Sequence, residues 1–278
     1  MTSLVQSSFI EQFKQHHENH KIEYSKAGDQ SLCVIYFSSH AIYFPNTQEE
    51  FIRNIIEKDK YEWYKMRHLN AGMHIFVRDV LKQWYLNGIN SAVNSIESLC
   101  ELLRSLTYGK RIICIGASAG GYAAILLGCL LNAEKVIAFN PQINLDYELQ
   151  NSVESENPLL FRYKDTNARK YFDLNSFMEC NTHIYYVYSS LSKWDNCQVA
   201  LMKHRDNIKV ISIKSDHHGV PIPKIILQEF ISANDRVFLR FTKKTARPVC
   251  IMLHINLRKT LSWYLKAYAK ICKDKLCP

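Results

Sequence analysis

Several features that define other classes of protein are missing from this sequence of 278 residues. It has only nine glycines and seven prolines, which argues against long flexible linkers, and it contains no internal repeat. No apolar run reaches the roughly 20 residues that a membrane-spanning helix needs. The N-terminal segment is polar, unlike a secretory signal. The sequence therefore indicates a folded protein, which we expect to be cytoplasmic.

The cysteine and histidine patterns give no sign of a disulfide framework or a metal centre. The nine cysteines form no C-x-x-C pair, and several lie in apolar segments: Cys33, Cys114 and Cys129. Buried thiols in odd number are typical of a reduced, cytosolic protein. His16, His17 and His20 have no defined set of partner ligands, so we expect a solvated helix face there and no metal site.

The positive charge is concentrated at the C-terminal end. Residues 231–278 contain eleven Lys and Arg against two Asp, which equals the +9 formal charge of the whole chain. An apolar stripe of helical period runs through residues 250–272 among these cations. Two interpretations stay open: this helix lies on an anionic membrane surface, at the inner face of the membrane, or it packs on the protein body or a partner protein. No recognised motif supports nucleic-acid binding.

Short β-rich apolar runs alternate with helical patterns along the chain. The runs are 32–37, 73–77, 112–115, 135–139, 182–188 and 208–213. This alternation predicts an α/β fold with a doubly wound, mostly parallel sheet. We expect a polar lead-in, a sheet domain, and a basic helical appendage at 1–30, 31–232 and 233–278. Within the sheet domain, residues 143–181 lack strand character and are predicted to form a small, polar helical cap.

The most informative stretch has the pattern G-x-S-x-G. A buried run at 112–115 leads to Gly116, Ser118 and Gly120, and an apolar helical segment follows. This strand, sharp turn and helix are typical of a nucleophile elbow, in which Ser118 projects from the top of the sheet. The backbone N–H of Ala119 would then face a developing oxyanion. A glycine-rich phosphate-binding turn is the alternative, but the glycine spacing differs from G-x-G-x-x-G.

An acid and a base follow the serine in the order that this fold uses. Asp195 comes after the run 182–188, and the pair His217 and His218 comes after 208–213, so all meet Ser118 at one edge of the sheet. We predict Ser118 as nucleophile, His218 as base and Asp195 as the acid that orients it. Gly219 frees the loop beside His218, and His217 is the alternative base. Asp195 could also be a helix N-cap.

Two strand ends suggest further contacts with substrate. Ser38 and Ser39 follow the run 32–37, where the fold supplies its second oxyanion N–H, so their backbone groups are candidate donors. Gln142 ends the run 135–139 at the edge where ligands bind in open parallel sheets, and it is a candidate substrate contact. For all three residues, an ordinary polar strand end is the alternative.

With these residues in place, the chain resembles the α/β-hydrolase superfamily over residues 30–232. Gly116 to Gly121 and the strand end Asn140-Pro141-Gln142 resemble the bacterial capsule polysaccharide O-acetyltransferases of that fold. The resemblance implies a Ser-His-Asp enzyme without a bound cofactor. Such an enzyme takes acetyl from acetyl-CoA as co-substrate and passes it to a carbohydrate hydroxyl during surface polysaccharide biosynthesis.

Two other functions stay open on the sequence. A carboxylesterase, thioesterase or deacetylase would use the same triad with water as the acceptor. A non-catalytic α/β-hydrolase-like module, in a secretion or polysaccharide assembly complex, would keep the fold without the reaction.

Overall fold

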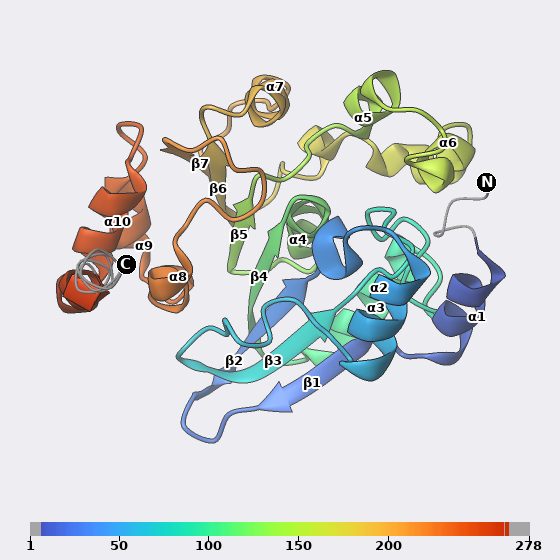
Figure 1. The fold of residues 1–278 in the computed structure, drawn as a ribbon, viewed down its shortest axis with the longest axis horizontal. Helices are drawn as coiled ribbons and strands as arrows, with labels where there is room; N and C mark the ends of the chain where they lie inside the picture. Colours follow the sequence, from blue (N-terminus) through green and yellow to red (C-terminus); the bar gives the residue numbers. More distant parts are fainter. Residues whose placement is uncertain (1–6, 264, 267–278) are drawn as a thin grey trace, which may run out of the picture.

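The computed structural model describes residues 7–263, 265 and 266. Its centre is a seven-stranded sheet in the order β1-β3-β2-β4-β5-β6-β7 (Figure 1). β1 is antiparallel to β3, and every other neighbouring pair is parallel. The predicted mostly parallel sheet is confirmed. The strands are β1 (His20–Tyr24), β2 (Asp29–Phe37), β3 (Ala71–Val77), β4 (Arg111–Ala117), β5 (Lys135–Phe139), β6 (His183–Ser189) and β7 (Ile208–Ile213).

Helices cover both faces of this sheet, which explains why its central strands are continuous apolar runs rather than alternating ones. On one face, α3 (Ile96–Leu106) and α4 (Ala119–Leu130) share a core with the strands. On the other face, a second core includes α8 (Lys224–Ile231), α9 (Asp235–Arg240) and α10 (Pro248–Ile255). Figure 1 shows these two groups on opposite sides of the strands.

A third, smaller core joins the N-terminal helix to the segment after β2. It contains side chains of α1 (Ser8–His16), the 3-10 helix η2 (His40–Tyr43), α2 (Gln48–Phe51) and the π-helix η3 (Ile52–Glu57). The ring of His17 stacks on Phe13 at 3.7 Å between centroids. In the part of the chain that the structure describes, no group of three or more His, Cys, Asp or Glu side chains is arranged to hold a metal ion.

The segment 143–181 is helical and packs beside α3 and α4. It contains α5 (Leu145–Asn151), α6 (Pro158–Tyr163) and the 3-10 helices η4 (Asn167–Tyr171) and η5 (Leu174–Ser176). The hydroxyl of Tyr122 in α4 donates to the carbonyl oxygen of Tyr171 at 2.5 Å. Lys170 pairs with Glu97 of α3 at 2.7 Å. These contacts fix the segment on the α4 side of the sheet's upper edge (Figure 1).

Two predictions about helices differ from the structure. Asp195, a candidate N-cap on sequence, lies in the first turn of α7 (Lys193–Ala200), whose N-cap is Ser192. The helix expected over 250–272 is interrupted at Asn256, where ψ is 87°, and helical backbone resumes at 257. Its predicted end, 267–272, lies outside the described residues. Among the helices described, none is long and apolar enough to cross a membrane.

Candidate active site

Ser118 occupies a strained turn between β4 and α4. Its backbone has φ 52° and ψ −123°, a conformation that costs energy for a residue with a Cβ. The turn tolerates only glycine at its flanks, because a Cβ on Gly116 would lie 2.0 Å from the carbonyl oxygen of Gly120. A Cβ on Gly120 would lie 2.3 Å from the carbonyl oxygen of Phe37. The elbow therefore needs small residues two positions before and two after the serine.

Three predicted side chains form one hydrogen-bonded chain at this elbow. Nε2 of His218 lies 2.9 Å from Oγ of Ser118, and Nδ1 of His218 lies 2.8 Å from Oδ1 of Asp195. An ionised carboxylate only accepts, so Nδ1 carries the proton and Nε2 is left to accept from the serine hydroxyl. The Asp195 side chain is 1% exposed and the His218 side chain 42%. This arrangement can activate a serine as a nucleophile.

The alternative base, His217, takes no part in this chain. Its ring lies beside Gly219, where an added Cβ would be 3.3 Å from Nε2 of His217. Ser118 is therefore hydrogen-bonded to His218, the histidine preferred on sequence.

Asn140 holds the loop that carries His218, and sequence reasoning missed it. Asn140 is fully buried, with φ 44°, at the end of β5. Its Nδ2 donates to the carbonyl oxygens of His217 at 3.2 Å and Gly219 at 2.9 Å. Its Oδ1 accepts from the backbone N–H of Ser189 at 2.7 Å. The only sequence signal was an asparagine that directly follows a buried strand.

A buried acid from the helical segment lies near the same histidine. Glu148 of α5 is 6% exposed, and its Oε1 accepts from Nε2 of Gln198 at 3.2 Å. Burial raises the pKa of Glu148 to about 7, and the charge of His218 opposes that rise. No sequence pattern indicated that this glutamate would lie near His218.

The backbone donors expected from Ser38 and Ser39 are already in use, which corrects that prediction. The N–H of Ser38 donates to the carbonyl oxygen of Val77 at 3.0 Å, which extends the β2–β3 ladder. The N–H of Ser39 donates to Oε2 of Glu62 at 2.7 Å. Neither group can donate to an oxyanion in this structure. Ala119 is the first residue of α4, and such N–H groups have no acceptor within the helix.

Gln142 lies against the hydroxyl of Ser118. Its Nε2 donates to Oγ of Ser118 at 3.2 Å, and its Oε1 accepts from Nε1 of Trp84 at 3.2 Å. Both Gln142 and Trp84 are buried, at 4% and 3% exposure. The structure therefore places the glutamine amide at the hydroxyl of Ser118, whereas the sequence suggested a contact with substrate.

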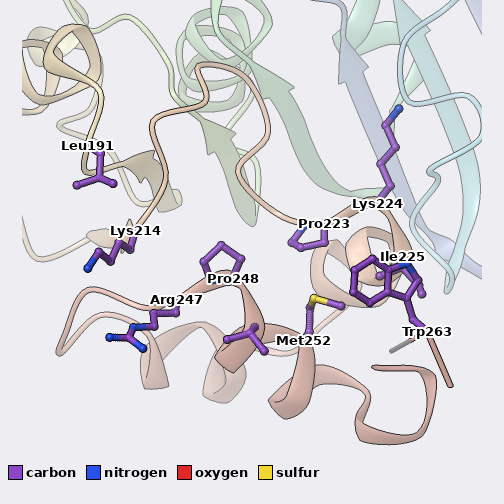
Figure 2. Close-up of a pocket in the computed structure, with 10 residues that line it drawn as sticks. Leu191, Lys214, Pro223, Lys224, Ile225, Arg247, Pro248, Met252 and Trp263 are labelled. Atoms are coloured by element: carbon purple, nitrogen blue, oxygen red, sulfur yellow. The ribbon is translucent and has the colours of Figure 1, made fainter. Parts of the chain in front are cut away.

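A groove of about 700 Å³ borders the loop that carries His218. Its apolar lining comes mainly from α8, α10 and Trp263, and three cations line it as well: Lys214, Lys224 and Arg247. Figure 2 shows Lys214 and Arg247 at one end of the groove and Trp263 at the other. Lys214 and Pro223 lie near the two ends of the loop that carries His218, so the groove lies beside this loop.

The sheet order, the elbow between β4 and α4, and the late acid and histidine define an α/β-hydrolase fold. No protein-family model and no curated protein sequence matches the chain.

Similarity was found among solved structures. The capsule O-acetyltransferase of Neisseria meningitidis serogroup A has 15% identity and a TM-score of 0.46, covering 71% of this chain and 85% of that one. An S-formylglutathione hydrolase from Agrobacterium tumefaciens has 13% identity and a TM-score of 0.47, covering 82% and 93%. Acetyl xylan esterase 1 from Thermoanaerobacterium sp. has 10% identity and a TM-score of 0.39, covering 69% and 71%. At these identities the likeness is one of fold.

Proposed function

We propose that the protein is a serine acyltransferase or esterase that acts on a carbohydrate through an acyl-enzyme at Ser118. The observation that carries this proposal is the hydrogen-bonded chain from Ser118 through His218 to Asp195. Nε2 of His218 takes the hydroxyl proton while Oγ attacks the carbonyl carbon of the donor. Asp195 holds the imidazole in the right tautomer and stabilises its cation.

His218 carries the proton through both halves of the reaction. In the first half it gives its proton to the leaving group, which departs as the acyl-enzyme forms. In the second half an acceptor hydroxyl binds, loses its proton to Nε2 of His218 and attacks the ester on Ser118. The bond from Oγ to the acyl group breaks, the acyl group stays on the acceptor, and the proton on His218 moves to Oγ, which restores the serine hydroxyl.

For the donor and acceptor we propose acetyl-CoA and a sugar of a surface polysaccharide such as a capsule. The likeness of Gly116 to Gly121 and of Asn140-Pro141-Gln142 to capsule O-acetyltransferases supports this choice. The cations of the groove beside the His218 loop suit a donor that bears phosphates. The polar helical segment 143–181 suits a polar acceptor. We place the enzyme in the cytoplasm, with its basic C-terminal segment against an anionic membrane surface or a partner protein.

A hydrolase that uses water is the second candidate. The His218 side chain is 42% exposed, so water can approach the base that would activate it. Hydrolysis and transfer share the acyl-enzyme and differ only in the acceptor.

Product analysis separates these functions. The protein is incubated with acetyl-CoA, with and without capsular-type oligosaccharides, and CoA and acetylated sugar are measured by mass spectrometry. A transferase gives acetylated sugar in proportion to CoA, and a thioesterase releases CoA at the same rate without acceptor. Product formation that is equal in wild type and Ser118→Ala would contradict both.

A further inference from the structure

We infer that Gln142 is the second oxyanion donor of this site, held in its donating orientation by Trp84. The inference rests on the proposed serine chemistry. An oxyanion hole needs at least one donor besides the N–H that follows the nucleophile. The backbone groups that usually occupy this position, at Ser38 and Ser39, donate to Val77 and Glu62 instead.

The orientation of the Gln142 amide is fixed by its partners. The indole N–H of Trp84 can only donate, so the atom that faces it at 3.2 Å must be the carbonyl oxygen of Gln142. The NH₂ group then faces Oγ of Ser118 at 3.2 Å. A flipped amide would set one donor against another and leave both buried groups unpaired. Since the serine accepts from Gln142, its own proton is directed to His218.

Trp84 is itself held in a costly backbone conformation. Lys82, Trp84 and Tyr85 have φ of 54°, 53° and 62°, which is uncommon for residues with a side chain. The buried carboxylate of Asp79 stabilises this turn, because it accepts from the N–H groups of Gln83 at 2.6 Å and Tyr85 at 3.0 Å. Strain of this kind persists only where the surroundings enforce it, and it is typical of functional sites.

A neutral histidine completes the support. The ring of His40 packs edge-on against Trp84, with 4.6 Å between centroids. Burial lowers the pKa of His40 to about 3, so its ring stays uncharged at neutral pH. The His40 ring therefore packs on Trp84 without adding a positive charge there.

The proposed step accounts for every bond. The Oγ–H bond breaks and its proton moves to Nε2 of His218, while Oγ bonds to the carbonyl carbon. The π pair of that carbonyl moves to its oxygen, which becomes an anion on the atom next to Oγ. One N–H of the Gln142 amide and the N–H of Ala119 donate to this oxygen. When the pair returns, the bond to the leaving group breaks and the proton on His218 moves to that group.

The test compares four variants in the hydrolysis of 4-nitrophenyl acetate. Gln142→Glu keeps the acceptor for Trp84 but loses the donor, and Gln142→Met loses the donor without adding charge. We expect kcat to fall about 10²- to 10³-fold in both, with KM within about twofold. Trp84→Phe frees the amide to rotate, so we expect about a tenfold loss of kcat with the midpoint of the pH profile unchanged. Gln228→Glu is the matched control: on α8 it loses a donor to the carbonyl oxygen of Arg67 at 3.3 Å, a group outside the proposed site, and kcat should stay within about twofold.

Two results would overturn the inference. Hydrolysis that depends on Ser118, with both Gln142 variants within threefold of wild type, would refute the oxyanion role and leave the proposed function standing. Hydrolysis by wild type that equals that of Ser118→Ala would refute the proposed function, and the role of Gln142 with it.

Discussion

Asn140 and His218 are linked through the backbone of the loop that carries the histidine. The side-chain amide of Asn140 donates to the carbonyl oxygens of the residues on both sides of His218, at 3.2 and 2.9 Å. Ser189 adds a third bond, from its hydroxyl to the carbonyl oxygen of His217 at 2.6 Å. The position of His218 therefore depends on the end of β5, a strand that lies between β4 and β6.

Replacing Asn140 with aspartate tests this link. An aspartate oxygen would face two carbonyl oxygens where an NH₂ group now donates, so the loop should shift. A shift of about 1 Å at a catalytic group can cost about 10²-fold in rate, and we expect kcat of Asn140→Asp to fall 10- to 100-fold. Steady-state kinetics with 4-nitrophenyl acetate measures the change, with the folded fraction checked by circular dichroism.

Asn207 offers a matched control at the opposite edge of the sheet. Its Nδ2 donates to three carbonyl oxygens, those of Met178, Cys180 and Thr182, at 3.0 to 3.1 Å. Asn207→Asp should therefore lower the melting temperature as Asn140→Asp does, while kcat per folded molecule stays unchanged. Equal losses of kcat in the two variants would show that Asn140 acts only on stability.

Glu148 should make the free energy of unfolding depend on pH. Burial raises its pKa from 4.5 to about 7 in the folded protein, so the folded state keeps a proton that the unfolded chain loses. The stabilisation is complete below pH 4.5 and is lost as the pH rises to about 7. Glu148→Gln removes this dependence. The free energy of unfolding of the variant, relative to that of wild type, should therefore increase over that range by at most about 3 kcal/mol.

Urea unfolding at several pH values between 4.5 and 8 measures this difference. Glu154→Gln, an exposed residue of the same helical segment, is the control and should follow the wild-type curve. A constant difference between Glu148→Gln and wild type across the range would show that burial does not raise the pKa of Glu148 in the folded protein.

The elbow predicts a sharp contrast between two glycines. At Gly116 an added Cβ would lie 2.0 Å from a backbone oxygen that cannot move without the elbow, so Gly116→Ala should destabilise by about 3 kcal/mol or more. Gly109 has open space but φ of 70°, so Gly109→Ala should cost only about 1 to 2 kcal/mol. Chemical denaturation of both variants measures the two costs. Similar costs would mean that the elbow can widen around a methyl group.

The groove beside the His218 loop should affect a phosphate-bearing donor but not a neutral ester. In Lys214→Ala/Arg247→Ala we expect KM for acetyl-CoA to rise about tenfold, since each lost charge–phosphate contact weakens binding. KM for 4-nitrophenyl acetate should not change. Lys243→Ala/Lys244→Ala serves as control, because it removes two exposed cations of the C-terminal segment 233–278 that do not line the groove. Equal effects in both double variants would point to general charge rather than this groove.

Local sequence patterns predicted the sheet well. The ends of β5 and β7 lie at the expected residues, because both runs are short, β-rich and bounded by polar residues. No local pattern marks Ser192 as the N-cap of α7, because Lys193 to Asn196 has no apolar period. The break at Asn256 was missed because the apolar stripe continues beyond it.

The residues of the candidate site also fall into two groups, those that local sequence patterns predict and those that depend on distant segments. Ser118, Asp195 and His218 follow strands, so chain order and sheet topology suffice to bring them together. The donors around them depend on contacts between distant segments. Glu62 accepts from the N–H of Ser39, which is 23 residues away in sequence, and Trp84 donates to Gln142, which is 58 residues away. No periodicity or spacing encodes such pairs.

The central claim is that Ser118 becomes acylated, and intact-mass spectrometry after brief exposure to acetyl-CoA tests it most directly. We expect one added acetyl group in wild type and none in Ser118→Ala. In His218→Ala acylation should slow by several orders of magnitude, because the nucleophile loses its base. An acetyl group on Ser118→Ala equal to that on wild type would place the nucleophile elsewhere. A wild type that neither gains acetyl nor releases CoA, and that a fluorophosphonate probe fails to label, would contradict a catalytic Ser118.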